Sequence, residues 1–304
     1  MKQRMVIVGL LLVAATGCVE VGEFGKQAGA NLLAATGMVS HEQATSLIDA
    51  SVKISSAVQE LTPEQEHYVG RTVGATILQR YPFYDGPQAT HYLNLLGQTL
   101  VKSSGAAETF SGYHFAILDT PEINAFSTPG GFVFVTRGML RLCKNEEMVA
   151  AVLAHEIAHV ELKHGLQAIK TSRLTSATAL LAVEGAKSVG SPEFRQLSSL
   201  FGESIQDTVT TLVDKGYSRS TELEADRTAV QILERSGYEA GSLVALLGAM
   251  EQVNREASDF AFLKTHPAPA DRLAALQAGQ PEISAPPLSP EWRHKRFGVA
   301  LGNV

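Results

Sequence analysis

The sequence predicts a mainly helical α+β protein in which a small β-sheet lies beside one buried helix. Helix start signals recur along the chain, short β-branched and aromatic runs flank a turn at residues 128–131, and a nearly continuous apolar stretch runs from Met148 to Leu153. The chain has 304 residues, 45% of them hydrophobic, which is enough for a sizeable core. Its formal net charge of -6 and the lack of a Lys/Arg run argue against nucleic acid as a partner.

The first 17 residues are predicted to be a signal peptide. Lys2 and Arg4 precede a short apolar run, and small residues lead into Cys18. This order resembles a bacterial lipoprotein signal, in which the cysteine becomes the lipidated first residue. The alternative is an ordinary secretory signal with an incidental cysteine. Val19 favours the outer membrane, so we expect a periplasmic protein held to that membrane by a lipid on Cys18.

Three further segments are expected after the signal peptide. Residues 18–60 form an N-terminal tether or helical segment, residues 61–278 the main domain, and residues 279–304 a Pro-rich tail that is extended or wraps around the domain. Cys143 is the second and last cysteine of the sequence, so no intrachain disulfide is expected. We interpret it as a small buried apolar residue and not as a nucleophile.

The main domain is predicted to begin with helices and strands. Thr62 is a helix N-cap with Pro63 at the first helical position. The expected elements are helices from Pro63 to about Arg80 and from Gln88 to Ser103, strands at Tyr113–Leu118, Asn124–Ser127 and Phe132–Val135, and a short helix near Thr136–Lys144. Phe132–Val135 is either an edge strand that pairs with an extended substrate or part of a structural hairpin.

The next helix is the most informative one. Asn145 is its expected N-cap, two acidic residues suit its first turn, and it should continue to about His164. A Ser/Thr/Ala-rich stretch of helical character follows at residues 171–215. Further helices are expected at Ser220–Glu234, Ala240–Asn254 and Ala270–Gln277.

His155-Glu156-Ile157-Ala158-His159 forms an HExxH motif on this buried helix. Residues four apart lie about 40° apart around a helix, so both imidazoles face the same way and can bind one Zn2+. The Glu156 carboxylate is one step round, where it can act as general base on a water molecule beside the metal. The alternative is a chance match, which would bury two histidines and a glutamate without partners.

A catalytic zinc site needs a third protein ligand. His164 lies about 140° around the helix from His159, so we expect it to point away, at the surface or behind a ligand. Leu162 and Gly165 stand where a metzincin would have Gly and His. Glu222 is the better candidate ligand, because Asp226 shares its helix face and can accept the outer N–H of a ligand histidine.

His266 and Arg272 are candidate catalytic residues near the metal. One of them could stabilise an oxyanion, or His266 could occupy the open zinc position in a resting state. The alternative is a loop anchored by Pro267 with a solvated Arg272.

Together these residues resemble peptidase family M48, which includes HtpX and the CAAX prenyl endopeptidases. The resemblance covers roughly residues 60–277 and rests on Asn124-Ala125-Phe126, Gly130-Gly131 before Phe132, the HExxH motif, Ser218-Arg219, Glu222-Leu223-Glu224-Ala225-Asp226, and His266-Pro267 with Arg272. It implies that His155, His159 and Glu222 bind zinc, that Glu156 is the base and that Asp226 supports a ligand. Without membrane-spanning helices or an appended repeat domain, the resemblance is to the soluble periplasmic lipoproteins of the family.

The expected fold is therefore a gluzincin-type zinc metallopeptidase domain. Its expected function is endoproteolysis of misfolded or unassembled envelope proteins, which it would bind as unfolded or extended polypeptides. The chief alternative is a metal-stabilised periplasmic chaperone or assembly factor for outer-membrane proteins that rarely cuts them. A structural zinc site is a third alternative, but it would leave Glu156 without a role.

Overall fold

The computed structural model describes residues 23–35, scattered positions between 37 and 48, and residues 61–105, 109–171, 216–256, 266–279 and 290–304. Contacts divide the chain into two compact units, residues 1–60 with 169–204 and residues 61–168 with 205–304. The first unit contains α2 (Glu23–Ala34), whose Ala30 packs with Ala44 and Ile48. The predicted signal peptide, Cys18 and the Ser/Thr/Ala-rich stretch from residue 172 lie outside the described residues.

The second unit contains the predicted helices and strands in the predicted order, and one further helix, α15, which was not predicted. They are α4 (Pro63–Arg80), α5 (Pro87–Ser104), β1 (His114–Leu118), β2 (Ala125–Thr128), the 3-10 turn η1 (Pro129–Gly131), β3 (Phe132–Thr136), α6 (Arg137–Leu142), α7 (Glu146–Glu161), α11 (Arg219–Arg235), α12 (Gly241–Glu256), α14 (Pro269–Gly279) and α15 (Glu291–Leu301). The mainly helical α+β class with a small sheet is thus confirmed. No helix in the described ranges is both long enough and apolar enough to cross a membrane.

Local capping chemistry explains where several helices begin. The Thr62 hydroxyl accepts a hydrogen bond from the backbone N–H of Gln65 at 3.3 Å, and the Gln65 side chain accepts one from Thr62 N–H at 2.9 Å. This reciprocal pair satisfies two N–H groups that the first turn leaves free. Thr136 caps α6 by a single bond, in which its hydroxyl accepts from Met139 N–H at 3.1 Å.

The sheet has the order β1-β3-β2, with β3 parallel to β1 and antiparallel to β2. Of the two alternatives for Phe132–Val135, the edge strand is therefore wrong, because β3 has a partner on each side. The hairpin alternative matches the antiparallel pair of β2 and β3. The outer edge of β1 is also occupied: the Asn94 side chain of α5 accepts from Phe115 N–H at 3.2 Å and donates to Phe115 C=O at 2.7 Å. Pro129 and Gly130 form the predicted turn, and Gly130 adopts the left-handed φ of 74° that glycine favours.

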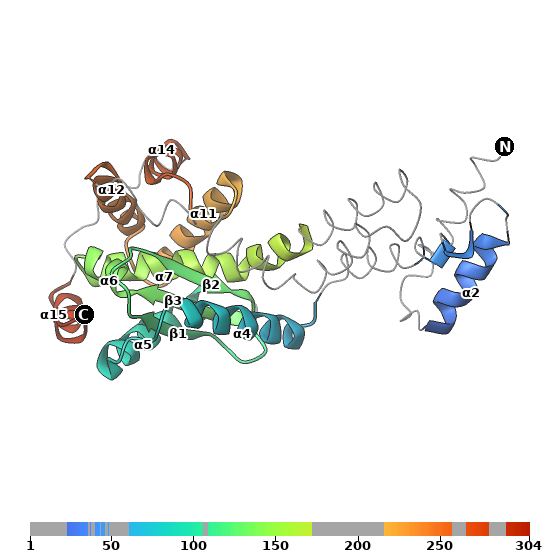
Figure 1. Cartoon of the computed structure of the whole chain (residues 1–304). Coiled ribbons are helices and arrows are strands. Elements are labelled where there is room, and N and C mark those ends of the chain that lie inside the picture. Colours follow the sequence, from blue (N-terminus) through green and yellow to red (C-terminus); the bar gives the residue numbers. More distant parts are fainter. Residues whose placement is uncertain are drawn as a thin grey trace. The chain divides into compact units, whose positions relative to one another are not determined.

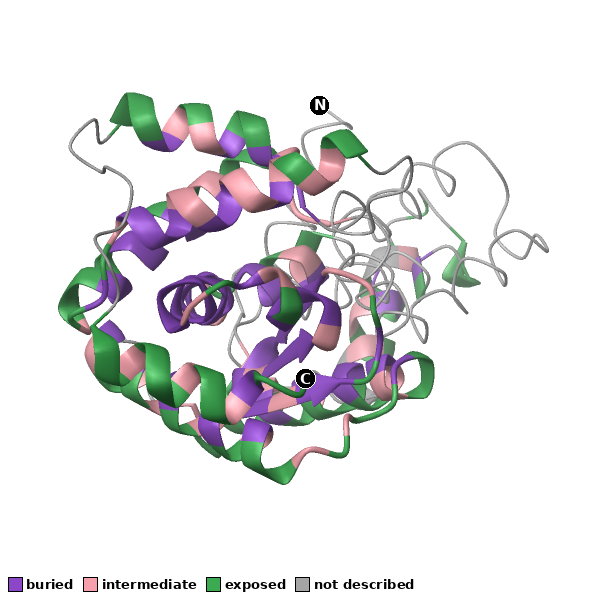
Figure 2. Cartoon of the chain, turned by 90° about the vertical axis from the view of Figure 1, so that its left-hand side faces the viewer, coloured by how far each residue is buried: buried purple, intermediate pink, exposed green. Residues whose placement is uncertain are grey.

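Helix α7 forms the centre of this unit. It contacts β2, β3 and α5 on one side and α11 and α12 on the other, as Figure 1 shows. Every residue from Glu146 to His159 is buried, whereas the surrounding helices turn buried faces inward and exposed faces outward (Figure 2). Cys143, which precedes α7, is buried as predicted, and burial raises the pKa of its thiol to about 12.

The C-terminal tail differs from its prediction. Residues 291–301 form helix α15, so the expectation of an extended segment is wrong there; residues 280–289 lie outside the described residues. The reason is that the prolines of the tail end at Pro290, and the residues that follow are free to form a helix. The compact unit that contains α7 also contains α15.

Helix α15 is held by a buried carboxylate at the start of α7. Glu146 has no solvent exposure and accepts hydrogen bonds from Tyr92 at 3.1 Å, Tyr238 at 2.9 Å and the Arg296 Nε at 2.7 Å. A second guanidinium nitrogen of Arg296 contacts the other Glu146 oxygen. The acid at the first turn of α7 thus connects α5, the turn after α11, and α15.

We expect Arg296→Ala to lower the free energy of unfolding by about 1–3 kcal/mol, because it removes two hydrogen-bond donors from the buried Glu146 carboxylate and leaves the Arg293 Nε, 3.8 Å away, to balance its charge. Lys295→Ala is the matched control, since Lys295 is exposed on the same helix, and it should change stability by about 0.5 kcal/mol or less. Urea denaturation followed by circular dichroism measures both. Equal losses for the two variants would contradict this account of Glu146.

Candidate metal centre

Helix α7 carries the HExxH motif and begins as the sequence predicts. The Asn145 side chain accepts a hydrogen bond from Met148 N–H at 2.9 Å, and Glu146 and Glu147 occupy the positive end of the helix. Alanines alternate with larger apolar residues along the helix, so neighbouring helices can approach it closely. The motif therefore lies on the part of α7 that is buried from Glu146 to His159.

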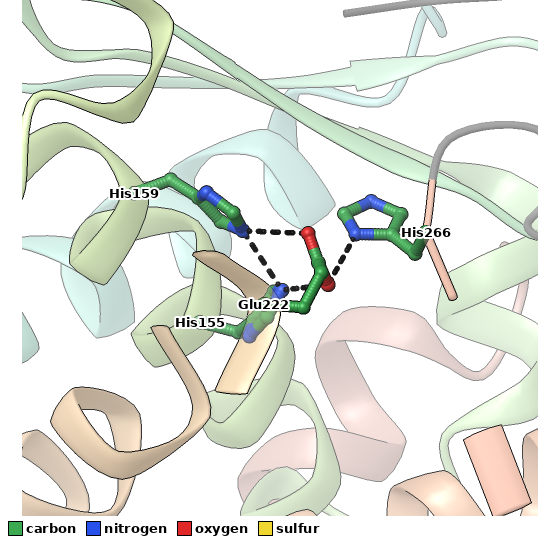
Figure 3. Close-up of side chains that lie close together, drawn as sticks. All are labelled: His155, His159, Glu222 and His266. Atoms are coloured by element: carbon green, nitrogen blue, oxygen red, sulfur yellow. Dashed lines mark hydrogen bonds and ion pairs between the residues drawn. The ribbon is translucent and has the colours of Figure 1, made fainter. Parts of the chain in front are cut away.

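The two histidines of the motif face one point. Their Nε2 atoms lie 3.1 Å apart, and the His155 and His159 side chains are almost completely buried. Figure 3 shows both rings directed towards the carboxylate of Glu222. This is the arrangement that their four-residue spacing predicts.

Glu222 comes from α11, which packs along α7. The hydroxyl of Ser218 caps this helix by accepting from Thr221 N–H at 3.3 Å. One Glu222 oxygen lies 3.4 Å from His155 Nε2 and the other 3.3 Å from His159 Nε2. Glu222 has no solvent exposure, whereas the side chain of Glu224 is 60% exposed, as expected for residues about 200° apart around a helix.

Asp226 lies one helical turn after Glu222 and is also fully buried. Its Oδ1 is 3.0 Å from Nδ1 of His155. The other nitrogen of that ring, Nε2, faces Glu222. Asp226 thus lies where the sequence predicts, supporting a candidate ligand from behind.

His266 and Arg272 both contact the cluster. His266 Nδ1 lies 2.8 Å from Glu222 Oε2, so the ring is among the candidate ligand atoms (Figure 3). Arg272 is 1% exposed; its Nε donates to Asp226 at 2.9 Å, and its Nη1 lies 3.3 Å from Glu222. The alternative of a solvated Arg272 is therefore wrong, because two buried carboxylates surround its guanidinium.

His164 also differs from the simplest prediction. Helix α7 ends at Glu161, short of the predicted His164, and Lys163 adopts a left-handed φ of 56°. This break returns His164 to the site, where its Nδ1 lies 2.9 Å from Nδ1 of His159. The surface alternative is wrong for this buried side chain, and its place behind His159 matches the other alternative. Burial, followed by the charge of His159, lowers the pKa of His164 to about 4.

The electrostatics of the cluster keep its carboxylates ionised. Burial alone would raise the pKa of Glu222, but His266 and Arg272 hold it well below its usual range. Arg272 likewise outweighs burial and lowers the pKa of Asp226. Burial and Arg272 lower the pKa of His155, but Asp226 and Glu222 outweigh both and raise it to about 9. The site therefore favours a positive charge between the histidines and Glu222.

The donor set fits a divalent metal ion. Ligand atoms of His155, His159, Glu222 and His266 all lie within 4.8 Å of one another, and all four residues are buried. Within the described part of the chain, Glu222 Oε1 is a buried acceptor with no hydrogen-bond partner. A cation would satisfy this oxygen, and imidazole nitrogens with a carboxylate are the ligands that zinc accepts.

Glu156 lies beside this cluster and outside it. It is buried and lines a small cavity together with His155, Arg272 and apolar side chains of α12. Tyr217 is a further residue of the site that was not predicted: its ring stacks on that of His159, with centroids 4.4 Å apart. The sequence shows only that Tyr217 directly precedes the N-cap of α11, and that position does not indicate a contact with the His159 ring.

Comparisons with known proteins agree with this geometry. The model of peptidase family M48 matches residues 87–280. The chain is 29% identical over 223 residues to the beta-barrel assembly-enhancing protease of Escherichia coli, covering 72% of this chain and 45% of that protein. It is 28% identical over 194 residues to the mitochondrial metalloendopeptidase OMA1 of Schizosaccharomyces pombe, covering 64% of this chain and 53% of that protein.

A putative beta-barrel assembly-enhancing protease of Vibrio cholerae is similar at 29% identity over 218 residues, or 70% of this chain and 43% of that protein. The chain thus spans about half the length of the curated relatives it matches. The family model covers more than half of the chain, including the HExxH helix and both buried acids of α11. The chain therefore belongs to peptidase family M48.

Proposed function

We propose that this protein is a zinc-dependent endopeptidase of the bacterial cell envelope that hydrolyses misfolded or unassembled envelope proteins. The observation that carries the proposal is that the side chains of His155, His159 and Glu222 meet at one buried point. Glu156 lies between the two histidines on α7. Relatives named as a beta-barrel assembly-enhancing protease and as a metalloendopeptidase support the same activity.

His155, His159 and Glu222 are the proposed zinc ligands, and Asp226 supports His155 through its second ring nitrogen. A zinc ion held by these residues would act as a Lewis acid that polarises a carbonyl and lowers the pKa of water. Arg272 is a positioning residue in this proposal, because it binds both acids of α11 and so holds Glu222 ionised and in place.

Glu156 is the proposed general base. Its carboxylate accepts a proton from the attacking water and then gives that proton to the amine that leaves when the peptide bond breaks. The apolar side chains around its cavity keep other water away from this exchange.

His266 has the role of a resting-state ligand in this proposal. Its Nδ1 lies 2.8 Å from Glu222, within the ligand cluster, and not at a separate position from which it could donate to an oxyanion. If His266 held the metal at rest, it would have to give up that position before a substrate carbonyl could take it.

The proposed location is the periplasm, with a lipid on Cys18 and attachment to the outer membrane. The support is the pattern of Lys2 and Arg4, the short apolar run and the small residues before Cys18. The names of the bacterial relatives, which refer to β-barrel assembly, agree with an envelope location.

We expect Glu156→Gln to reduce cleavage of casein by about 100- to 10,000-fold, the usual contribution of a general base. Zinc should stay bound, because Glu156 does not belong to the ligand cluster. Metal analysis and a digest of the purified protein measure the two effects. Undiminished cleavage would refute the peptidase mechanism, and a cellular phenotype that survives Glu156→Gln but not zinc removal would favour the chaperone alternative.

Glu222→Ala should lose zinc, whereas Glu224→Ala should keep it. The physical reason is that Glu222 faces both histidines and Glu224 faces solvent. Metal content of the two purified variants, measured side by side, decides the matter. Glu224→Ala should also change stability by about 0.5 kcal/mol or less, as an exposed substitution does. The opposite pattern of metal loss would show that Glu224 is the ligand.

Mass spectrometry of the mature N-terminus should find a lipidated Cys18 as the first residue, and the protein should fractionate with membranes. Cys18→Ser is the matched control. It replaces the sulfur atom that would carry the lipid, so this variant should appear in the soluble fraction. An unmodified cysteine, or cleavage at another site, would refute the anchor.

A further inference from the structure

The two proposed ligand histidines differ in what holds their second ring nitrogen. Nδ1 of His155 lies 3.0 Å from a carboxylate oxygen of Asp226. Nδ1 of His159 lies 2.9 Å from another imidazole, that of His164. A metal-binding histidine almost always donates this second N–H to a fixed acceptor, which sets the tautomer and the orientation of the ring.

We propose that His164 is the positioning residue for His159. Its unprotonated Nδ1 accepts the N–H of His159 and so directs the opposite nitrogen of that ring to zinc. The inference rests on the proposed function and adds to it a residue outside the HExxH motif.

The hydrogen positions follow from the geometry. His159 Nε2 faces the cluster, 3.3 Å from Glu222, and must present a lone pair to a metal there, so the ring hydrogen is on Nδ1. Two nitrogens 2.9 Å apart share one hydrogen, which places the hydrogen of His164 on its Nε2. The Glu224 carboxylate lies 3.7 Å from that Nε2, too far for a hydrogen bond but close enough to favour a hydrogen there.

A break in the backbone makes this contact. On a continuous helix His164 would lie about 140° from His159. Instead Lys163 has a φ of 56°, and it is the only non-glycine residue with positive φ in the described ranges. A left-handed conformation is unfavourable for a lysine, so the surrounding structure must hold this turn. The ion pair of Lys163 with Glu66, at 2.8 Å, is one such contact.

The His159 ring is held on two sides as a result. Tyr217 covers one face, with an angle of 17° between the ring planes, and His164 holds the edge that faces away from the cluster. Removing the acceptor would leave a buried N–H without a partner, which weakens the preferred ring orientation and with it the ligand.

The test compares His164→Leu, which removes the acceptor, with His164→Asn, whose side-chain oxygen can replace Nδ1. His67→Leu is the matched control, because His67 is a buried histidine of α4 that is not one of the clustered ligand residues. Zinc affinity of the full mature chain is measured by competition with a chromophoric chelator, and the absorption spectrum of the Co2+-loaded protein reports ligand geometry. Circular dichroism checks folding, and His164→Ala replaces His164→Leu if the latter does not fold.

We expect His164→Leu to weaken zinc binding by about 10- to 100-fold and to change the Co2+ spectrum, as loss of such a partner does elsewhere. His164→Asn should recover most of the affinity, and His67→Leu should bind zinc as the unchanged protein does. Unchanged affinity in His164→Leu would overturn the inference, as would equal losses in the Leu and Asn variants, which indicate a packing role. A starting protein that binds no zinc would overturn the proposed function itself.

Discussion

Two carboxylates of α11 are buried without solvent contact against the histidines of α7, and the rest of the site depends on compensating them. A buried carboxylate without a partner costs several kcal/mol, so Glu222 and Asp226 need positive or hydrogen-bonding groups around them. Arg272 of α14 provides the permanent cation, and the rings of His155 and His266 provide donors. The position of α14 is therefore set by charge as well as by apolar packing.

The packing of α11 on α7 supports the same contacts. Glu222 and Asp226 alternate with Ala225 and Ala229 on one stripe of α11, and the two alanines are completely buried. Small side chains let the two helices approach closely, which brings the carboxylates within 3.0–3.4 Å of the histidine nitrogens. A larger residue on this stripe would separate the helices and the ligands together, so core packing and metal binding share one interface.

Both ends of α7 are held by interactions that the chemistry does not use directly. At its start, Glu146 binds two tyrosines and Arg296 of α15. At its end, the left-handed Lys163 stops the helix and returns the chain towards His159. Because α7 is buried on all sides and held at both ends, the relative positions of His155 and His159 are fixed. Among the four clustered residues, only His266 comes from outside α7 and α11.

Features that depend on neighbours along the chain could be predicted before the fold was known. The caps at Thr62 and Asn145 can be recognised from residues within one helical turn. The shared face of His155 and His159 follows from the helical repeat. The choice of Glu222 over Glu224 follows from that repeat together with Asp226, which shares the face of Glu222. The family also follows from motifs that are each local, although they are spread over the chain.

Tertiary structure decided the features that depend on contacts between distant residues. β3 became a central strand because β1 and β2 both pair with it, and Arg272 became buried because two acids from another helix surround it. The helix at residues 291–301 docks on Glu146, about 150 residues earlier in the chain. His164 reached His159 only because one backbone torsion at Lys163 left the helical range. Periodicity assumes a continuous helix and contains no information on partners across the fold, so only the packed chain could decide these positions.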